Sequence, residues 1–296
     1  MPMLVDIKAF LATARLGGFS AAGREIGTAP SVVAKRVNRL EHEIGTKLFV
    51  RTTRKLSLTP DGQRLRPQVQ TLVSELDETL RDLRRPGRDL GGALRVHAPT
   101  AIGTVFVGPS IARFQRDHPD VKTELSLTDR SVNPLEDGYD IAFGDAPQTF
   151  PSVEATMIAS YPQLPVAAPA YLDRRGIPDQ PGELAEHDCI AFVASGLTWT
   201  FVGPQGPMPV EIHPRFTVND SRLLADAAEQ GIGVTVVPEF VARAPIAAGR
   251  LVPLLPDWPL QSHRLVAMVP SHKAGRPEVA ALVDHVRTDL DPAPWH

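Results

Sequence analysis

The sequence predicts an α/β protein that carries an all-α, winged helix-turn-helix domain at its N-terminus. Helical periodicity and helix caps dominate residues 1–62, whereas short apolar strands alternate with helices from residue 92 onward. The length of 296 residues fits two domains of about 150 residues each. Residues 1–64 hold eleven Lys and Arg against five Asp and Glu, a net charge of +6, and the remainder carries −9. A basic N-terminal segment (residues 1–64, called the head below) on an otherwise acidic chain favours a polyanionic partner for that segment.

Composition argues against several protein classes. Hydrophobic residues make up 43% and charged residues 22%, which is ordinary for a globular chain. No apolar run approaches the ~18 residues of a membrane span, and residues 1–10 carry Asp6 and Lys8 where a signal peptide would be apolar. Cys189 is the single cysteine and is expected to be a small buried residue. We expect a cytoplasmic protein with no membrane contact, metal or cofactor.

The first segment has the period of an amphipathic helix, and Gly17-Gly18 ends it. Ser20 is expected to be the N-cap of a short helix over 21–26, which Gly27 ends in a left-handed conformation. Pro30 suits the first turn of a third helix. The buried face of that helix is expected to comprise Val33, Val37, Leu40 and Ile44. Two short helices around a tight glycine turn form a helix-turn-helix.

A basic hairpin and a long helix are expected to follow. Residues 48–50 and 56–58 are short apolar runs around a basic tip, typical of a wing. Thr59 and Pro60 form an N-cap and first-turn pair that opens a helix over 60–83. The apolar seam of that helix is Leu65, Val69, Leu72, Leu76 and Leu83. Heptad spacing favours a homodimer helix, and the alternative is a helix packed on its own domain.

Residues 84–92 have linker composition, and the pattern then changes. Helices are expected over 102–118 and 222–231. The strands are expected at 93–96, 121–127, 140–143, 164–168, 190–193, 215–218, 234–237 and 265–269. Strands that alternate with helices predict βαβ units and a mostly parallel sheet.

The stretch from Asp6 to Gly62 resembles the DNA-binding region of LysR-type transcriptional regulators. The matching elements are Ala9-Phe10, Gly18-Phe19-Ser20-Ala21-Ala22, Ile26-Gly27, Pro30-Ser31-Val32-Val33, Arg39-Leu40-Glu41, Ile44-Gly45, Lys47-Leu48-Phe49, Arg51-Thr52-Thr53-Arg54 and Leu58-Thr59-Pro60-Asp61-Gly62. The remainder is similar to the effector domain of that family, through Gly92-Ala93-Leu94-Arg95-Val96, Asp137-Gly138-Tyr139-Asp140-Ile141-Ala142, Ala167-Ala168-Pro169-Ala170-Tyr171-Leu172, Val218-Asn219-Asp220 and Gly231-Ile232-Gly233-Val234.

The resemblance covers essentially the whole chain and implies its organisation. It implies a DNA-binding domain at 1–62, a dimerisation helix and hinge at 63–91, and a periplasmic-binding-protein-like effector domain at 92–296. Subdomain I is expected at 92–162 and 269–296, and subdomain II at 163–268. The implied partners are double-stranded promoter DNA, a small-molecule effector in the cleft such as an organic or aromatic acid, and further copies in a homodimer or homotetramer.

The third helix is expected to enter the major groove with its first turns. The residues expected at the DNA are Ser20, Pro30, Ser31, Ala34, Lys35, Asn38 and Arg39, with Arg51, Thr53, Arg54 and Lys55 on the wing. Lys35 can reach guanine or phosphate, and Arg39 is expected at a phosphate. Ala29 and Ala34 stand where serine is common in the family, so two hydrogen bonds are lost. Gly23 replaces a common alanine and weakens its helix slightly.

The effector is expected in the cleft, where strands end at their carboxyl edges. Thr100 follows the first strand near a helix N-terminus that suits an anion. Thr128 follows the second strand, and Ser195 and Asn219 follow strands of the second subdomain. The alternative is that these four residues only cap helices and turns.

Two other functions fit the sequence less well. Gly231-Ile232-Gly233-Val234 begins like a dinucleotide fingerprint but lacks the third glycine and precedes a strand, and no other catalytic motif is present. A solute-binding protein would not need the basic head. We therefore expect a regulator and not an enzyme.

Overall fold

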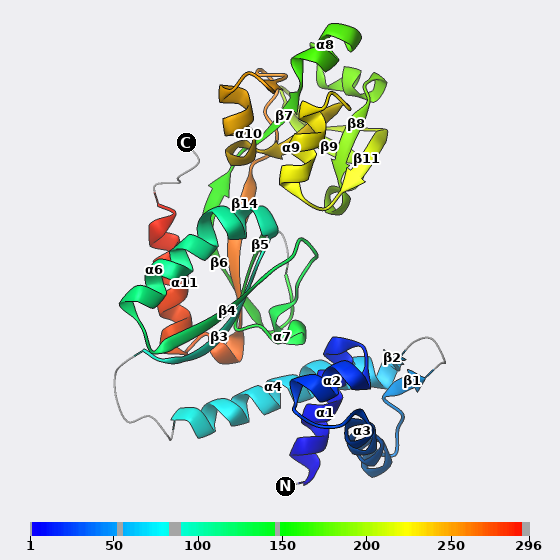
Figure 1. Cartoon of the computed structure of the whole chain (residues 1–296), viewed down its shortest axis with the longest axis vertical. Coiled ribbons are helices and arrows are strands. Elements are labelled where there is room, and N and C mark those ends of the chain that lie inside the picture. The colour runs from blue at the N-terminus through cyan, green and yellow to red at the C-terminus, as the bar shows by residue number, and fades with distance from the viewer. Residues whose placement is uncertain (1, 52–55, 83–89, 146–148, 292–296) are drawn as a thin grey trace.

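The computed structural model describes residues 2–51, 56–82, 90–145 and 149–291. The chain forms a helical head and two α/β subdomains (Figure 1). One long helix, α4 (Pro60–Asp82), connects the head to the rest and runs alongside the nearer subdomain. Within the described ranges, no helix is both long and apolar enough to cross a membrane.

Three helices form the head, namely α1 (Pro2–Leu16), α2 (Phe19–Glu25) and α3 (Pro30–Ile44). Gly27 between α2 and α3 has φ +64°, and Pro30 is the first residue of α3, so both predictions are confirmed. The expected Ser20 cap is wrong, because α2 begins at Phe19 behind an extended Gly18 and Ser20 lies inside the first turn. Val33, Val37 and Leu40 are buried as predicted, whereas Ile44 is 41% exposed at the end of α3.

The wing is an antiparallel hairpin of β1 (Phe49–Arg51) and β2 (Leu56–Leu58), in which Phe49 faces Leu58. Thr59 caps α4 as predicted, because its hydroxyl oxygen accepts a hydrogen bond from the Gly62 amide at 3.0 Å. Gly62 is needed for close approach, since a Cβ at this position would collide with the Leu48 carbonyl oxygen. These contacts fix the start of α4 against the wing.

The apolar seam of α4 divides into two parts. Leu65 and Val69 pack against the core of the head together with Val73, which is 9% exposed and was not predicted. Leu72 is 63% and Leu76 39% exposed. The first half of the helix therefore packs on its own domain, whereas Leu72 and Leu76 are uncovered in the described structure. Leu83 lies outside the described residues.

The first subdomain is a five-stranded sheet in the order β4-β3-β5-β14-β6. Its strands are β3 (Gly92–Ala98), β4 (Val121–Leu127), β5 (Ile141–Asp145), β6 (Val153–Tyr161) and β14 (His263–Pro270). Its helices are α5 (Thr100–Ile102), continued by a π-helical turn (Gly103–Val107) and α6 (Gly108–Asp117), then α7 (Pro134–Asp137) and α11 (Pro277–Asp289). Helices α6 and α11 lie side by side over one face (Figure 1) and share an apolar core with the sheet.

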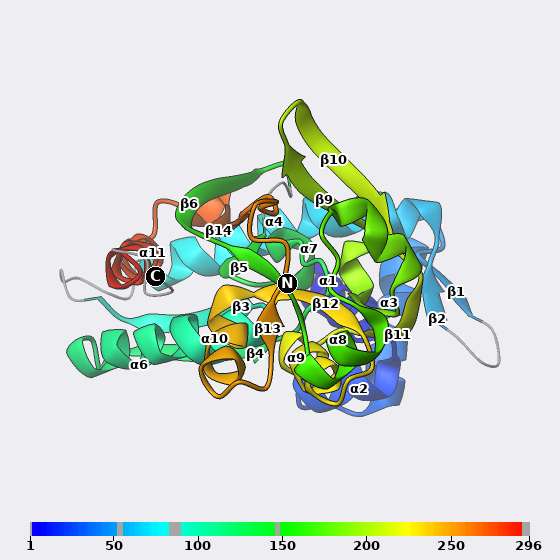
Figure 2. The same ribbon diagram turned by 90° about the horizontal axis from the view of Figure 1, so that it is seen from above.

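The second subdomain is a five-stranded sheet in the order β11-β8-β12-β7-β13. Its strands are β7 (Gln163–Ala167), β8 (Cys189–Phe192), β11 (Pro214–Val218), β12 (Val234–Pro238) and β13 (Val252–Pro253). Its α-helices are α8 (Pro169–Arg175), α9 (Ser221–Glu229) and α10 (Glu239–Ala247), and it has short 3-10 turns at Pro181–Glu186 and Val193–Ser195. A further 3-10 turn, Ser271–Lys273, belongs to the first subdomain. A separate hairpin of β9 (Thr198–Gly203) and β10 (Gly206–Glu211) projects from this subdomain (Figure 2).

Two features of the effector module differ from the sequence prediction. Each main sheet is mixed, because two of its four strand pairs are parallel and two antiparallel. The expected boundary between residues 268 and 269 is wrong, because β14 pairs along its whole length with β6 of the first sheet. The chain therefore returns to the first subdomain at His263. Together with the step from β6 to β7, this makes two crossovers between the subdomains.

Candidate functional site

The exposed face of α3 carries five of the eleven residues predicted to contact DNA. Pro30, Ser31, Lys35 and Asn38 are exposed and Ala34 is half-buried, opposite the buried Val33 and Val37. The N-cap residue Ala29 offers no side-chain acceptor. The first turn of α3 is thus an exposed, positively polarised helix end, which suits a phosphate.

Arg39, which was predicted at a phosphate, is bound to a buried carboxylate of the head. Its Nε donates to Asp6 Oδ2 at 2.5 Å, and a second nitrogen donates to the other oxygen of the same carboxylate. The Asp6 side chain is fully buried, whereas that of Arg39 is 45% exposed. The hydrogen bond to Asp6 raises the pKa of Arg39. This bidentate pair clamps α1 to α3, so Arg39 positions the recognition helix.

A buried carboxylate attaches the wing to α3. Glu41 is 3% exposed, and its carboxylate accepts hydrogen bonds from the Leu48 amide at 2.9 Å, the Phe49 amide at 3.2 Å and Lys47 Nζ at 2.8 Å. Burial alone would raise the pKa of Glu41, but these three donors outweigh it and lower the pKa. Glu41 stays ionised and fixes β1 relative to α3.

The remaining predicted DNA contacts lie elsewhere. Ser20 is exposed on α2. Arg51 ends β1, while Thr53, Arg54 and Lys55 lie outside the described residues.

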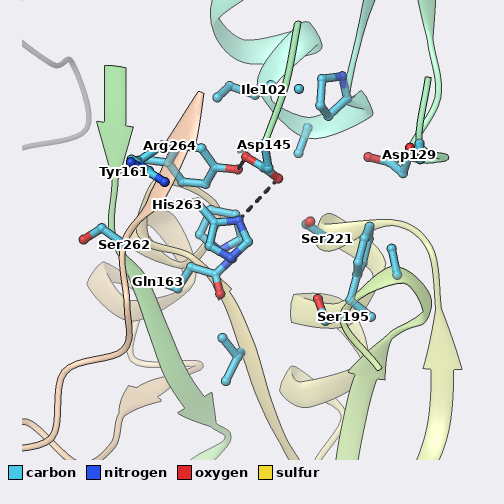
Figure 3. Close-up of a pocket in the computed structure, with 18 of the residues that line it drawn as sticks. Ile102, Asp129, Asp145, Tyr161, Gln163, Ser195, Ser221, Ser262, His263 and Arg264 are labelled. Carbon is cyan, nitrogen blue, oxygen red and sulfur yellow. Dashed lines mark hydrogen bonds and ion pairs between the residues drawn. The ribbon is translucent and has the colours of Figure 1, made fainter. Parts of the chain in front are cut away.

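A cleft of about 660 Å³ lies between the two subdomains. Its first wall includes Ile102 and three residues that follow β4, namely Thr128, Asp129 and Arg130. Its second wall includes Ser195 and Ser221, with an apolar surface from Phe192, Trp199 and Leu260. The crossover residues Tyr161, Gln163, His263 and Arg264 line it between the two walls (Figure 3).

Of the four predicted effector residues, Thr128 and Ser195 line this cleft and Thr100 and Asn219 do not. The helix N-terminus at Thr100 was expected to hold an anion. Instead, the Asp129 carboxylate accepts the Thr100 amide hydrogen bond at 3.0 Å. The chain thus supplies its own anion at this position. Asn219 is exposed beside Asp220, which caps α9 by accepting from the Leu223 amide at 2.8 Å.

A polar group that the sequence analysis did not identify lies at the crossovers. The Tyr161 hydroxyl donates to Asp145 Oδ1 at 2.6 Å, and His263 Nδ1 lies 3.3 Å from Asp145 Oδ2 (Figure 3). Burial, reinforced by the charges of Asp145 and Asp129, raises the pKa of Tyr161 well above its ordinary value. Tyr161 therefore remains a hydrogen-bond donor to the Asp145 carboxylate in the cleft.

His97 also lines the cleft and is 2% exposed. Its Nε2 lies 3.0 Å from the Thr128 carbonyl oxygen, which only accepts, so Nε2 carries a proton. Burial lowers the pKa of His97 although the bond to Thr128 opposes the shift. A neutral His97 therefore fixes the position of Thr128.

Residues 87–291 match the family model described as "LysR substrate binding domain". Residues 4–63 match the family model described as "Bacterial regulatory helix-turn-helix protein, lysR family". The chain belongs to the LysR family of transcriptional regulators. PtxR of Pseudomonas aeruginosa, an HTH-type transcriptional regulator, is 31% identical to this LysR-type regulator over 296 residues, covering 99% of this chain and 94% of PtxR. The probable regulator LtrA of Klebsiella pneumoniae is 30% identical over 258 residues, or 86% and 84% of the two chains.

Two solved structures support the architecture of this LysR-type regulator. A full-length AphB variant has a TM-score of 0.70 at 25% identity and covers 99% of this chain and 98% of its own. CrgA of Neisseria meningitidis, described as a LysR-type transcriptional regulator, has a TM-score of 0.57 at 28% identity, covering 97% and 96%. The protein is thus a DNA-binding transcriptional regulator with a C-terminal effector-binding domain, and not an enzyme.

Cys189 has no features of a nucleophile. It is fully buried, and burial together with the nearby Asp188 raises the pKa of its thiol to about 12. Among the described residues, no group of three or more His, Cys, Asp or Glu side chains could hold a metal ion.

Proposed function

We propose that this LysR-type regulator is cytoplasmic and binds promoter DNA by inserting the first turns of α3 into the major groove. The observation that carries the proposal is the exposed face of Ser31, Lys35 and Asn38 beside an uncapped helix N-terminus. The basic wing follows the DNA backbone next to it. Arg39 positions α3 through Asp6.

The binding unit in this proposal is a homodimer in which α4 pairs with α4 of a second copy. Leu72 and Leu76 are one helical turn apart on α4, and both side chains are exposed. A second copy would remove both from water. A tetramer would be a pair of such dimers.

Footprinting on the genomic DNA fragments that the purified protein retains tests whether a dimer reads DNA through α3. A dimer that reads DNA through α3 protects two half-sites about one helical turn, 10–10.5 base pairs, or a multiple of that, apart. Protection of a single site, or of sites without fixed spacing, contradicts the dimeric mode.

The effector, in this proposal, is an organic or aromatic acid that occupies the cleft. Phe192, Trp199 and Leu260 offer an apolar surface for a ring or chain. The carboxylate does not bind at Thr100, because Asp129 already takes that amide. Arg264 lines the cleft and is exposed, so it is the cation that we assign to the acid.

A second candidate effector is an amine. Asp129 and Asp145 both present carboxylates to the cleft (Figure 3), and an ammonium group would be attracted to them. Its aromatic body would occupy the same apolar surface.

Matched probes distinguish the two candidates. We expect phenylacetate to raise the melting temperature of the wild type more than phenethylamine does, and Arg264→Gln to abolish the difference. Asp145→Asn should leave phenylacetate binding in place. A preference for phenethylamine that Asp145→Asn removes would establish the amine and refute the acid.

A further inference from the structure

The loop after β4 contacts the cleft at one end and α7 at the other. Arg130 lines the cleft, and its guanidinium pairs with Asp137 at the end of α7. Nη2 lies 2.8 Å from Asp137 Oδ1, and Nη1 lies 3.2 Å from Oδ2. A bidentate pair of this kind fixes both distance and direction.

Helix α7 is a single, well-braced turn. The Asn133 side chain accepts from the Leu135 amide at 3.1 Å, and the Asn133 amide donates to Asp137 Oδ2 at 3.2 Å. The same Asp137 carboxylate therefore holds Arg130 and the N-terminal end of α7. Pro134 and Leu135 are buried, so packing also anchors the turn.

The far side of α7 contacts the DNA-binding half of the chain. Arg66 on α4 donates a hydrogen bond to the Glu136 carbonyl oxygen, and α4 and α7 lie against each other (Figure 1). Arg15 of α1 also lies near Gly138, at the C-terminal end of the turn. Carbonyl oxygens at a helix C-terminus attract cations, and the Arg66 guanidinium meets one of them directly.

We propose that Arg130 and α7 couple the effector cleft to the linker helix α4 within one chain. This inference rests on the proposed function of the cleft as the effector site. An effector that is held at Arg264 and also reaches Arg130 with a polar group competes with Asp137 for the Arg130 guanidinium, and α7 and the Arg66 contact respond. Arg130 is a positioning residue in this scheme. The ion pair is half-exposed, with 55% of the Arg130 side chain accessible, so it supports an effect of up to about fivefold.

Amide hydrogen exchange of the full chain tests the coupling without an effector or DNA. Arg130→Gln is expected to speed exchange up to about fivefold in the peptide spanning 60–76 of α4 as well as in α7. Arg113→Gln is the matched control, because Arg113 pairs with Asp289 at the same 2.8 Å and is 48% exposed, on the far helices α6 and α11. This variant should leave α4 unchanged.

A double-mutant cycle then separates coupling from general loosening. In an Arg66→Gln background, Arg130→Gln should no longer change exchange in α4. Asp137→Asn removes the other partner of the Arg130–Asp137 ion pair and must also speed amide exchange in α4. This second variant keeps the test valid if Arg130→Gln misfolds. Unchanged α4 exchange, or equal effects with and without Arg66, overturns the proposal. Failure of the DNA footprint would overturn the proposed function and leave this result standing.

Discussion

Replacing Glu41 by Gln is expected to detach the start of the wing from α3. The carboxylate receives two backbone N–H groups and one ammonium in a site that is 3% exposed. Hydrogen bonds to a charged group contribute about 1.5–3 kcal/mol to stability. Both backbone N–H groups bond to Oε1, which Gln can keep only as a neutral acceptor, and the NH2 group that replaces Oε2 points at the Lys47 ammonium. We therefore expect a local loss of about 1.5–3 kcal/mol, or roughly 10- to 150-fold in the opening equilibrium.

Hydrogen exchange of the Leu48 and Phe49 amides measures this opening directly, since both bond to Glu41. Glu43→Gln is the control, because Glu43 is an exposed glutamate two residues away on the same helix. Equal protection in the two variants would refute the assignment of Glu41 as the residue that attaches the wing.

The effect of Glu41 should depend on pH in a defined direction. Its pKa is lowered in the folded chain, so its contribution is complete above the ordinary glutamate pKa of about 4.3. The contribution falls as the pH drops through the lower, folded-state pKa. The difference between wild type and Glu41→Gln should therefore be full at pH 7 and shrink in acid. A difference that grows in acid contradicts the sign.

Two further predictions concern DNA binding and assembly. Lys35→Ala should weaken binding to a specific DNA site by about 1–3 kcal/mol if Lys35 reads guanine, and an anisotropy titration measures this. Lys122→Ala, at an exposed position on β4, is the control and should not change the affinity. Equal affinities of the two variants would remove Lys35 from the interface. The double variant Leu72→Ser, Leu76→Ser should lower the mass measured by light scattering to that of a monomer. Leu197→Ser is the control, because Leu197 is 52% exposed in the second subdomain, and it should leave the mass unchanged. A dimer that persists in the double variant would refute the α4 seam as the interface.

The head was predictable because its signals are local. Gly27 and Pro30 fix the turn and the start of α3 through their own backbone preferences, and Thr59 caps α4 three residues ahead of the amide it binds. The Ser20 cap failed because Gly18 can occupy the same position in an extended conformation. The role of Arg39 was not predictable, since Asp6 lies 33 residues away in sequence.

The cleft was predictable in position but not in chemistry. Strand ends indicate where a cleft opens, which is how Thr128 and Ser195 were identified. Asp145, Tyr161 and His263 belong to three strands that pair side by side in the first sheet, and no spacing in the sequence encodes that pairing. The mixed sheets were missed for a related reason, because an isolated apolar run does not specify the direction of its neighbour.

Sequencing of the genomic fragments that the purified full-length protein retains at two salt concentrations tests the central claim most directly. Phosphate contacts alone weaken steeply with salt, whereas base readout preserves a preference among sequences. The account predicts a shared, partly palindromic site that persists at the higher salt with wild type and is depleted with Lys35→Ala. Salt-labile retention without a shared site, equal in both proteins, would contradict it.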